Sequence, residues 1–120
     1  KIEIYQEIAL CDTDKKIQDV TDEIIDRFGD IPEETKNLLE IASIKILCRI
    51  LGIIKISQRL SGIVFNFSAE SFKMEWIDLL LKKFRNKIKF SPSVEPYITY
   101  KIENPGKILE EVKELIKILK

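Results

Sequence analysis

The chain has 120 residues, of which 45% are hydrophobic and 33% charged, with 20 basic and 20 acidic side chains and no histidine. These are the length and composition of one ordinary globular domain. Charged residues interrupt every apolar stretch before it reaches the ~18 residues of a membrane helix, which excludes a transmembrane segment. Acids outnumber bases 12 to 7 in residues 1–51, and bases outnumber acids 13 to 8 in residues 52–120. This distribution is polarised, but neither half is basic enough to indicate a nucleic-acid-binding protein.

The start of the chain and its cysteines indicate a cytoplasmic protein. The first residue, Lys1, is not a methionine, so we expect a fragment of a longer chain. Residues 1–9 alternate charged and apolar side chains and lack the apolar core of a secretory signal. Cys11 and Cys48 lie far apart in helix-like segments, without the spacing of a disulfide framework. We expect two reduced thiols, with Cys48 the better protected from solvent.

Three amphipathic helices are predicted in the first half. The first ends near Cys11, and the second begins after a cap at Asp12 or Thr13. The apolar positions of the second helix, which include Phe28, repeat every 3.6 residues up to Gly29. A third helix starts with an early proline and acids in its first turn and ends at Gly52. Its apolar residues cover most of its circumference, so we expect it to be the central helix of this half.

After Gly52 the apolar period changes from 3.6 to 2, which indicates strands. The predicted elements, in chain order, are strands 54–60 and 63–68 joined at Ser61-Gly62, a helix capped by Ser71, strands 87–90 and 97–102, and a last helix opened by Asn104-Pro105. The fold class is therefore α+β, with three helices in residues 1–52 and two ββα units in residues 53–120. We expect a single domain whose four-stranded, mostly antiparallel sheet has helices packed on it.

The sequence lacks the parts of a catalytic, cofactor or metal site. Without histidine there is no common general base or His-containing dyad. The four glycines are isolated, so no phosphate-binding loop exists. Two cysteines alone do not make a standard zinc site, and Asp12-Thr13-Asp14 fits a helix cap better than a calcium loop. We therefore expect no catalytic, cofactor-binding or metal-binding residue and no enzyme activity in this chain.

The segment Lys82–Lys89 is the one basic cluster, with five cations in eight residues. One interpretation is that it binds a phosphate backbone while Phe84 or Phe90 stacks on a base. A solvated helix end explains the same residues, because cations suit a helix C-terminus and both phenylalanines fit the core pattern. We favour the helix end and expect little or no direct nucleic-acid binding. An independent nucleic-acid-binding module that uses this segment is the alternative.

Four carboxylates share one face of the predicted second helix, at positions i, i+3, i+4 and i+7: Asp19, Asp22, Glu23 and Asp26. Like charges at these spacings repel by roughly 0.2–0.5 kcal/mol per pair, and we expect no local cation to offset them. The face is either a solvated acidic surface or a docking surface for arginines of another domain.

The stretch DEIIDRFGDIP at residues 22–32 resembles the signature of the C-terminal domain of bacterial transcription-repair coupling factors, the TRCF domain. The similarity continues through NLLEIA at residues 37–42 and LGI at residues 51–53. The opening IYQEIA at residues 4–9 is similar to the family's Tyr-x-x-Ile-Ala entry. The order of helices followed by two ββα units also matches the family over nearly the whole chain.

The resemblance implies a parent protein that is an ATP-driven double-stranded-DNA translocase, with ATP and Mg bound outside this domain. The parent displaces stalled RNA polymerase and recruits nucleotide excision repair. The resemblance further implies that this domain is a cofactor-free regulatory clamp, which masks the recruitment surface of an excinuclease-B-like module in the same chain. The excinuclease A subunit and RNA polymerase would then be indirect partners, and no membrane is involved.

In the family, acidic residues on the helix that leads into the DRFG motif (residues 26–29 here) meet arginines of that excinuclease-B-like module. The matching positions are Glu23 and Asp26, which favours the docking interpretation for the whole acidic face.

Overall fold

The structure is a computed structural model that describes residues 2–120. The chain divides after Ile46 into two compact units, residues 1–46 and 47–120. The expectation of one domain with halves that meet at residues 52 and 53 stays a prediction. Within residues 2–120, no helix has both the length and the apolar character needed to cross a membrane.

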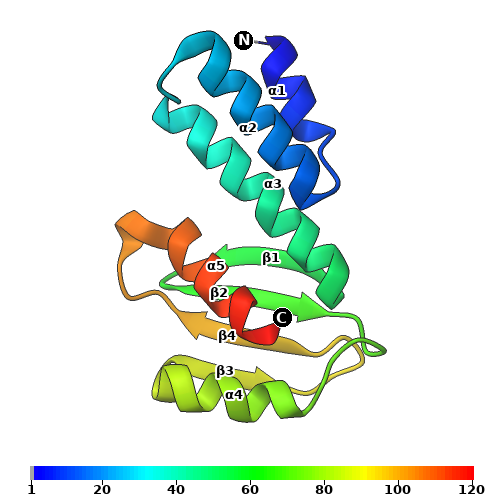
Figure 1. Ribbon diagram of the computed structural model, residues 1–120. Coiled ribbons are helices and arrows are strands. Elements are labelled where there is room, and N and C mark those ends of the chain that lie inside the picture. The colour runs from blue at the N-terminus through cyan, green and yellow to red at the C-terminus, as the bar shows by residue number, and fades with distance from the viewer. Residues whose placement is uncertain (1) are drawn as a thin grey trace. The chain divides into compact units, whose positions relative to one another are not determined.

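Three helices appear in the first half, as predicted: α1 (Ile2–Ala9), α2 (Asp14–Phe28) and α3 (Glu33–Leu51) (Figure 1). Of the two candidate caps, Thr13 begins α2, because its hydroxyl oxygen accepts a hydrogen bond from the backbone N–H of Lys16 at 3.1 Å. Gly29 ends α2 at φ +80°, and its N–H donates to the carbonyl of Ile25 at 2.8 Å.

The core of the first unit takes side chains from all three helices. Its buried members are Ile4 and Ile8 of α1, Ile24 of α2, and Leu39 and Ala42 of α3. The apolar stripe of α2 is buried at Ile24, but it is exposed at Phe28, the last residue of the helix. Phe28 is 57% exposed, and the guanidinium of Arg27 lies 5.5 Å from the centre of its ring.

The second unit contains the four-stranded sheet, which confirms the α+β class (Figure 1). Its strands are β1 (Ile53–Arg59), β2 (Gly62–Phe67), β3 (Ile88–Ser91) and β4 (Tyr97–Lys101). They lie in the order β1-β2-β4-β3, and each neighbouring pair is antiparallel. The helices of this unit are α4 (Glu75–Phe84), α5 (Ile108–Leu119) and the short 3-10 turns η1 (Arg85–Lys87) and η2 (Pro105–Lys107).

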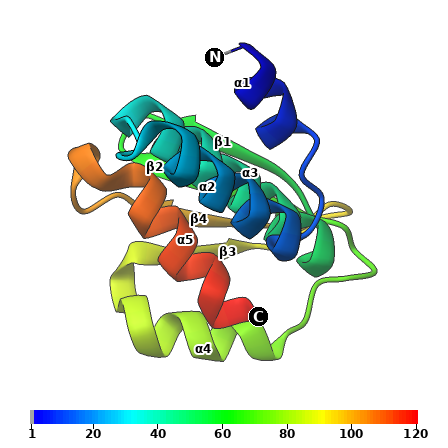
Figure 2. The same cartoon turned by 45° about the horizontal axis from the view of Figure 1, so that its top comes forward.

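Helices α4 and α5 lie on the same side of the sheet (Figures 1 and 2). Phe65 and Phe67 of β2 are fully buried on this side. The ring of Tyr100 on β4 meets Phe84 of α4 edge to face, with ring centres 5.2 Å apart. The single tryptophan, Trp76, is a buried core residue of α4. We call this side of the sheet the inner face.

The first hairpin turns one residue earlier than predicted. Its turn residues are Leu60 and Ser61, while Gly62 pairs with Arg59 inside the sheet. Leu60 has φ +52° and is fully exposed. The positive φ of this turn therefore falls on Leu60, although hairpin turns favour glycine at such a position.

The predicted cap of α4 is also wrong. Ser71 does not begin the helix, which starts at Glu75 after Met74 and has no side-chain cap. The N–H of Ser71 instead donates to the hydroxyl of Ser68 at 3.3 Å. Ser71 lies so close to Gly52 that a Cβ at position 52 would be 2.2 Å from the Ser71 Cβ. Close packing against Gly52 fixes Ser71 outside the helix.

Asn104 and Pro105 open the last helical segment, as predicted, through the 3-10 turn η2 ahead of α5. The side-chain oxygen of Asn104 accepts a hydrogen bond from the N–H of Gly106 at 2.9 Å. The carboxylate of Glu111 accepts the N–H groups of Glu103 at 2.9 Å and Asn104 at 2.7 Å. Glu111 thus reaches back from α5 and fixes the connection from β4.

Candidate functional site

The acidic face of α2 consists of Asp19, Asp22, Glu23 and Asp26, and the helix brings them together on one surface of the first unit. The three aspartates are exposed, and the side chain of Glu23 is 43% exposed. No member of the face belongs to the hydrophobic core cluster of this unit. The face is therefore accessible to a partner without unfolding of the helix.

Local partners offset part of the repulsion on this face, so the expectation that α2 has no suitable cation is wrong. Lys15 lies 3.5 Å from Asp19, and Arg27 lies 3.3 Å from Glu23, both at i,i+4 spacing. The side-chain amide of Gln18 donates to Asp22 at 2.9 Å. These pairs lie in solvent, where such interactions contribute only about 0–1 kcal/mol each.

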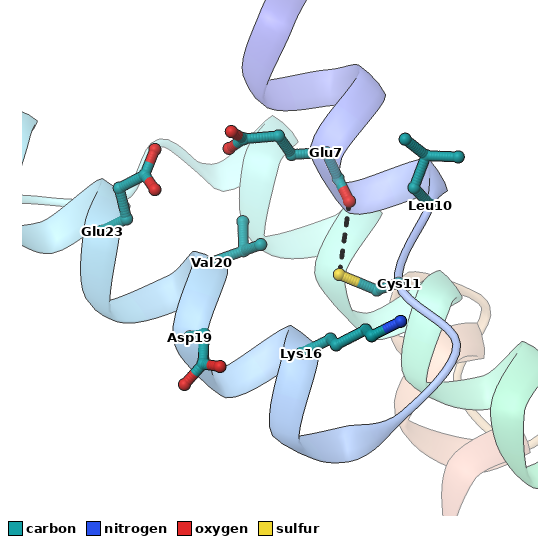
Figure 3. Close-up of a pocket in the computed structure, with 7 residues that line it drawn as sticks. All are labelled: Glu7, Leu10, Cys11, Lys16, Asp19, Val20 and Glu23. Atoms are coloured by element: carbon teal, nitrogen blue, oxygen red, sulfur yellow. Dashed lines mark hydrogen bonds between the residues drawn. The ribbon is translucent and has the colours of Figure 1, made fainter.

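A groove of about 330 Å³ lies between α1 and α2 beside this face (Figure 3). Its lining residues are Glu7, Leu10 and Cys11 from the first helix and its end, and Lys16, Asp19, Val20 and Glu23 from α2. The side chains of Glu7 and Glu23 extend toward each other from the two helices (Figure 3). The one cation of the lining, Lys16, is paired with Asp12 at 2.9 Å. The groove therefore presents three carboxylates from two helices.

Glu7 is not among the residues predicted from the sequence. The acidic face follows from the period of α2, and that period carries no information on which side of α1 packs against it. The signal available in the sequence is weak: Glu7 is adjacent to Ile8, which is buried in the core between the helices.

Both cysteines are free thiols, in agreement with expectation. The thiol of Cys11 donates to the carbonyl oxygen of Glu7 at 3.3 Å at the edge of the groove (Figure 3). Burial raises its pKa, and burial raises the pKa of Cys48 to about 11. Both groups are thus protonated near neutral pH and do not have the lowered pKa of a nucleophilic cysteine. Among residues 2–120, no group of acidic or cysteine side chains is placed to hold a metal ion.

The structure separates the members of the basic segment Lys82–Lys89. Phe84 is buried against Tyr100, and Phe90 is stacked on Phe72 with ring centres 5.1 Å apart. Lys87 forms an ion pair with Glu103. Neither phenylalanine therefore offers a free ring to a base, which removes the stacking part of the alternative interpretation.

The chain has relatives among known proteins over nearly its whole length. The family model described as the TRCF domain matches residues 1–75. The transcription-repair-coupling factor of Rickettsia prowazekii is 30% identical over 116 residues, which are 97% of this chain and 10% of that protein. The corresponding protein of Borreliella burgdorferi is 32% identical over 105 residues, 87% of this chain and 9% of its own length. The chain thus spans about a tenth of the curated relatives it matches.

A solved structure shares the fold. A crystal structure of the C-terminal domain of transcription-repair coupling factor superposes with a TM-score of 0.82 at 23% identity, covering 99% of this chain and 78% of the other.

Proposed function

This chain belongs to the TRCF domain family, and from that premise we propose that it is a non-catalytic regulatory domain of a transcription-repair coupling factor. The parent is a cytoplasmic ATP- and Mg-dependent translocase on double-stranded DNA that displaces stalled RNA polymerase and recruits nucleotide excision repair. The motor lies outside this chain. The domain docks through the acidic face of α2 on an excinuclease-B-like module of the same parent and masks its recruitment surface for the excinuclease A subunit.

The observation that carries the proposal is the accessible, strongly acidic surface formed by α2 together with Glu7. Residues 1–46 contain 12 acids and 6 bases, so the whole first unit is acidic. A surface of one sign selects a partner surface of the opposite sign and sets the orientation of docking. Arginine suits the role, because its guanidinium binds carboxylates in a bidentate geometry that fixes register.

The ion pairs within α2 do not compete strongly with a partner. In the pair Lys15–Asp19 the two side chains are 85% and 63% exposed, and in Arg27–Glu23 they are 55% and 43% exposed. Exposed i,i+4 pairs contribute roughly 0.3–0.5 kcal/mol. An arginine that closes over the groove and excludes water makes a stronger pair than either local cation.

Reversal of Glu23 and Asp26 to lysine in the parent protein tests this docking. Loss of a desolvated charge pair costs on the order of 2–5 kcal/mol, and about 1.4 kcal/mol is a tenfold change in population. The double variant is therefore expected to leave the clamp mostly open. The readouts are binding of the excinuclease A subunit and ATP turnover, both without RNA polymerase, and both are expected to rise.

The matched control is Glu110→Lys/Glu114→Lys, which makes the same change in net charge at two exposed positions of α5. This control is expected to behave as the unaltered parent. If the α2 variant recruits no better than the unaltered parent, the acidic face is a solvated surface and the docking proposal fails.

A further inference from the structure

The sheet of the second unit has an outer face, on the side away from α4 and α5. Side chains alternate along a strand, and every second residue of β2, up to Phe65 and Phe67, is buried in the core. The residues between them, Gly62, Val64 and Asn66, therefore point outward. Antiparallel partners share a face, so the register of the sheet identifies the outward positions on the other three strands.

The register gathers cations from three strands on this outer face. Arg59 of β1 and Lys101 of β4 flank Gly62 of β2 from opposite sides. Lys55 of β1 is the partner of Asn66, and Lys89 of β3 is the partner of Thr99. All four cations are exposed. The remaining outward positions of the four strands are small, polar or apolar, and none is acidic.

Within residues 2–120, no ion pair neutralises the charge of these four cations. Among the ion pairs of residues 2–120, none involves Lys55, Arg59, Lys89 or Lys101. The nearest acid beyond the end of β4, Glu103, is paired with Lys87. The face therefore keeps a positive potential, and a polyanion that binds here releases counterions without breaking an internal ion pair.

One aromatic side chain lies on the same face. Tyr97 of β4 is half-buried, and its neighbours across the sheet are Asn66 of β2 and Ser91 of β3. Within residues 2–120 its ring contacts no other aromatic ring, in contrast to Phe84 and Phe90. A tyrosine among small polar neighbours and cations is suited to stack on an unpaired base.

We propose that the outer face of the sheet binds single-stranded nucleic acid, with Arg59, Lys101, Lys55 and Lys89 contacting phosphates and Tyr97 stacking on a base. Sheet surfaces with exposed aromatics and cations bind single strands, whereas the grooves of duplex DNA admit a helix or a two-stranded ribbon. The sequence predicts little or no nucleic-acid binding because its one continuous basic segment is a weak signal, whereas the cations of the outer face are scattered along the chain. These cations come from three separate strands, and the sheet register brings them together.

The test is fluorescence anisotropy of a labelled 20-mer of oligothymidylate titrated with the 120-residue chain. The expected dissociation constant is roughly 10⁻⁶ to 10⁻⁴ M near physiological salt, the range of sequence-independent binding. Four phosphate contacts give a slope of about −3 in log affinity against log salt for a single strand. Raising the salt from about 50 to about 200 mM then weakens binding about 50-fold.

Two variants and a matched control locate the site. Arg59→Glu/Lys101→Glu is expected to weaken binding at least about tenfold, since it replaces two phosphate contacts by repulsion. Tyr97→Thr, which keeps a residue suited to a strand, is expected to lose about fivefold or more through the missing stack. Lys82→Glu/Lys83→Glu makes the same charge change on the exposed end of α4 and is expected to stay within about threefold. Far-UV circular dichroism checks folding, and Arg59→Ser/Lys101→Ser replaces the reversal if it unfolds.

Three outcomes overturn the proposal. One is the absence of saturable binding up to about 1 mM protein at the low salt, where this kind of binding is strongest. Another is an equal loss in the α4 control, which would mean that net charge and not the sheet face determines affinity. The third is binding of a 20-base-pair duplex or of polyglutamate as tightly as the single strand, since neither offers an unpaired base to Tyr97.

Discussion

The hydroxyl of Tyr100 on β4 donates a hydrogen bond to the carboxylate of Glu111 on α5, which also accepts two backbone N–H groups of the intervening connection. Partial burial disfavours the charged carboxylate, but these three hydrogen bonds outweigh it, so the pKa of Glu111 lies below its ordinary value. Burial, followed by the bond to Glu111, raises the pKa of Tyr100. The charged carboxylate of Glu111 thus links β4, the connection after it and α5.

We expect the contribution of Glu111 to depend on pH. Its folded pKa is depressed, so the unfolded chain binds more protons in this range and stability rises with pH. The contribution is present above the ordinary value of 4.5 and is lost as the pH falls through the lower folded pKa. Glu111→Gln is expected to cost about 1–3 kcal/mol at pH 7. Urea denaturation from pH 7 to pH 3 measures the difference, which should shrink below pH 4.5; a difference that is constant with pH contradicts the assignment.

Two glycines with nearly the same positive φ should respond differently to alanine. Gly29 has φ +80°, and a Cβ added there would meet no atom within 4 Å, whereas at Gly52, with φ +79°, it would lie 2.2 Å from the Ser71 Cβ. Gly29→Ala should cost at least about 1–2 kcal/mol from the positive φ alone. Gly52→Ala should cost a further ~1–3 kcal/mol from overpacking. Urea midpoints test the order, and adding Ser71→Gly to Gly52→Ala should relieve the overpacking but not the strain that both sites share.

Replacing a side chain of α3 by alanine should lower the free energy of unfolding substantially only where that side chain is buried. Leu39 and Leu47 are 8% and 5% exposed, in the first and second units respectively, whereas Ile50 is 69% exposed. Leu39→Ala and Leu47→Ala should each cost about 2–5 kcal/mol from lost burial and the cavity that remains. Ile50→Ala on the same helix should change the free energy of unfolding by no more than ~0.5 kcal/mol. Equal midpoints for all three would mean that the buried side of α3 is misassigned.

The acidic face should be dispensable for folding. Glu23→Lys/Asp26→Lys in the isolated chain removes the Arg27–Glu23 pair but also the repulsion between neighbouring carboxylates. Because both effects are a few tenths of a kcal/mol, the net change should stay within ~1 kcal/mol. Urea denaturation and far-UV circular dichroism measure it. A loss above ~2 kcal/mol would show that these carboxylates are structural, which the docking proposal does not allow.

Local signals in the sequence predicted the helices and the strand plan. The 3.6-residue period and the glycine stops located the three N-terminal helices, since both act within one turn. The hairpin shifted by one residue, because sheet pairing places Gly62 opposite Arg59 and leaves Leu60 in the turn. Ser71 looks like a cap in sequence, but its packing against Gly52, far along the chain, overrides that signal.

The two surfaces differ in how far the sequence reveals them. The acidic face lies on one helix, so its four members follow from periodicity alone. Glu7 joins them only through the packing of α1 on α2. The outer sheet face depends on the pairing of β2 with β4, which are separated by α4 and β3. The cation pair across Gly62 is therefore a product of strand register, which no local pattern in the sequence encodes.

The position of Cys11 allows occupancy of the groove to be measured through the reactivity of a native thiol. Its thiol lines the same groove as Glu7 and Glu23, while Cys48 is in α3 with a pKa raised by burial to about 11. In a Cys48→Ala background of the 120-residue chain, Cys11 is the one remaining cysteine, so an alkylating reagent at mildly alkaline pH labels its sulfur beside the acidic face. A partner seated in the groove shields that atom. The initial rate of labelling then measures the fraction of chains whose groove is unoccupied.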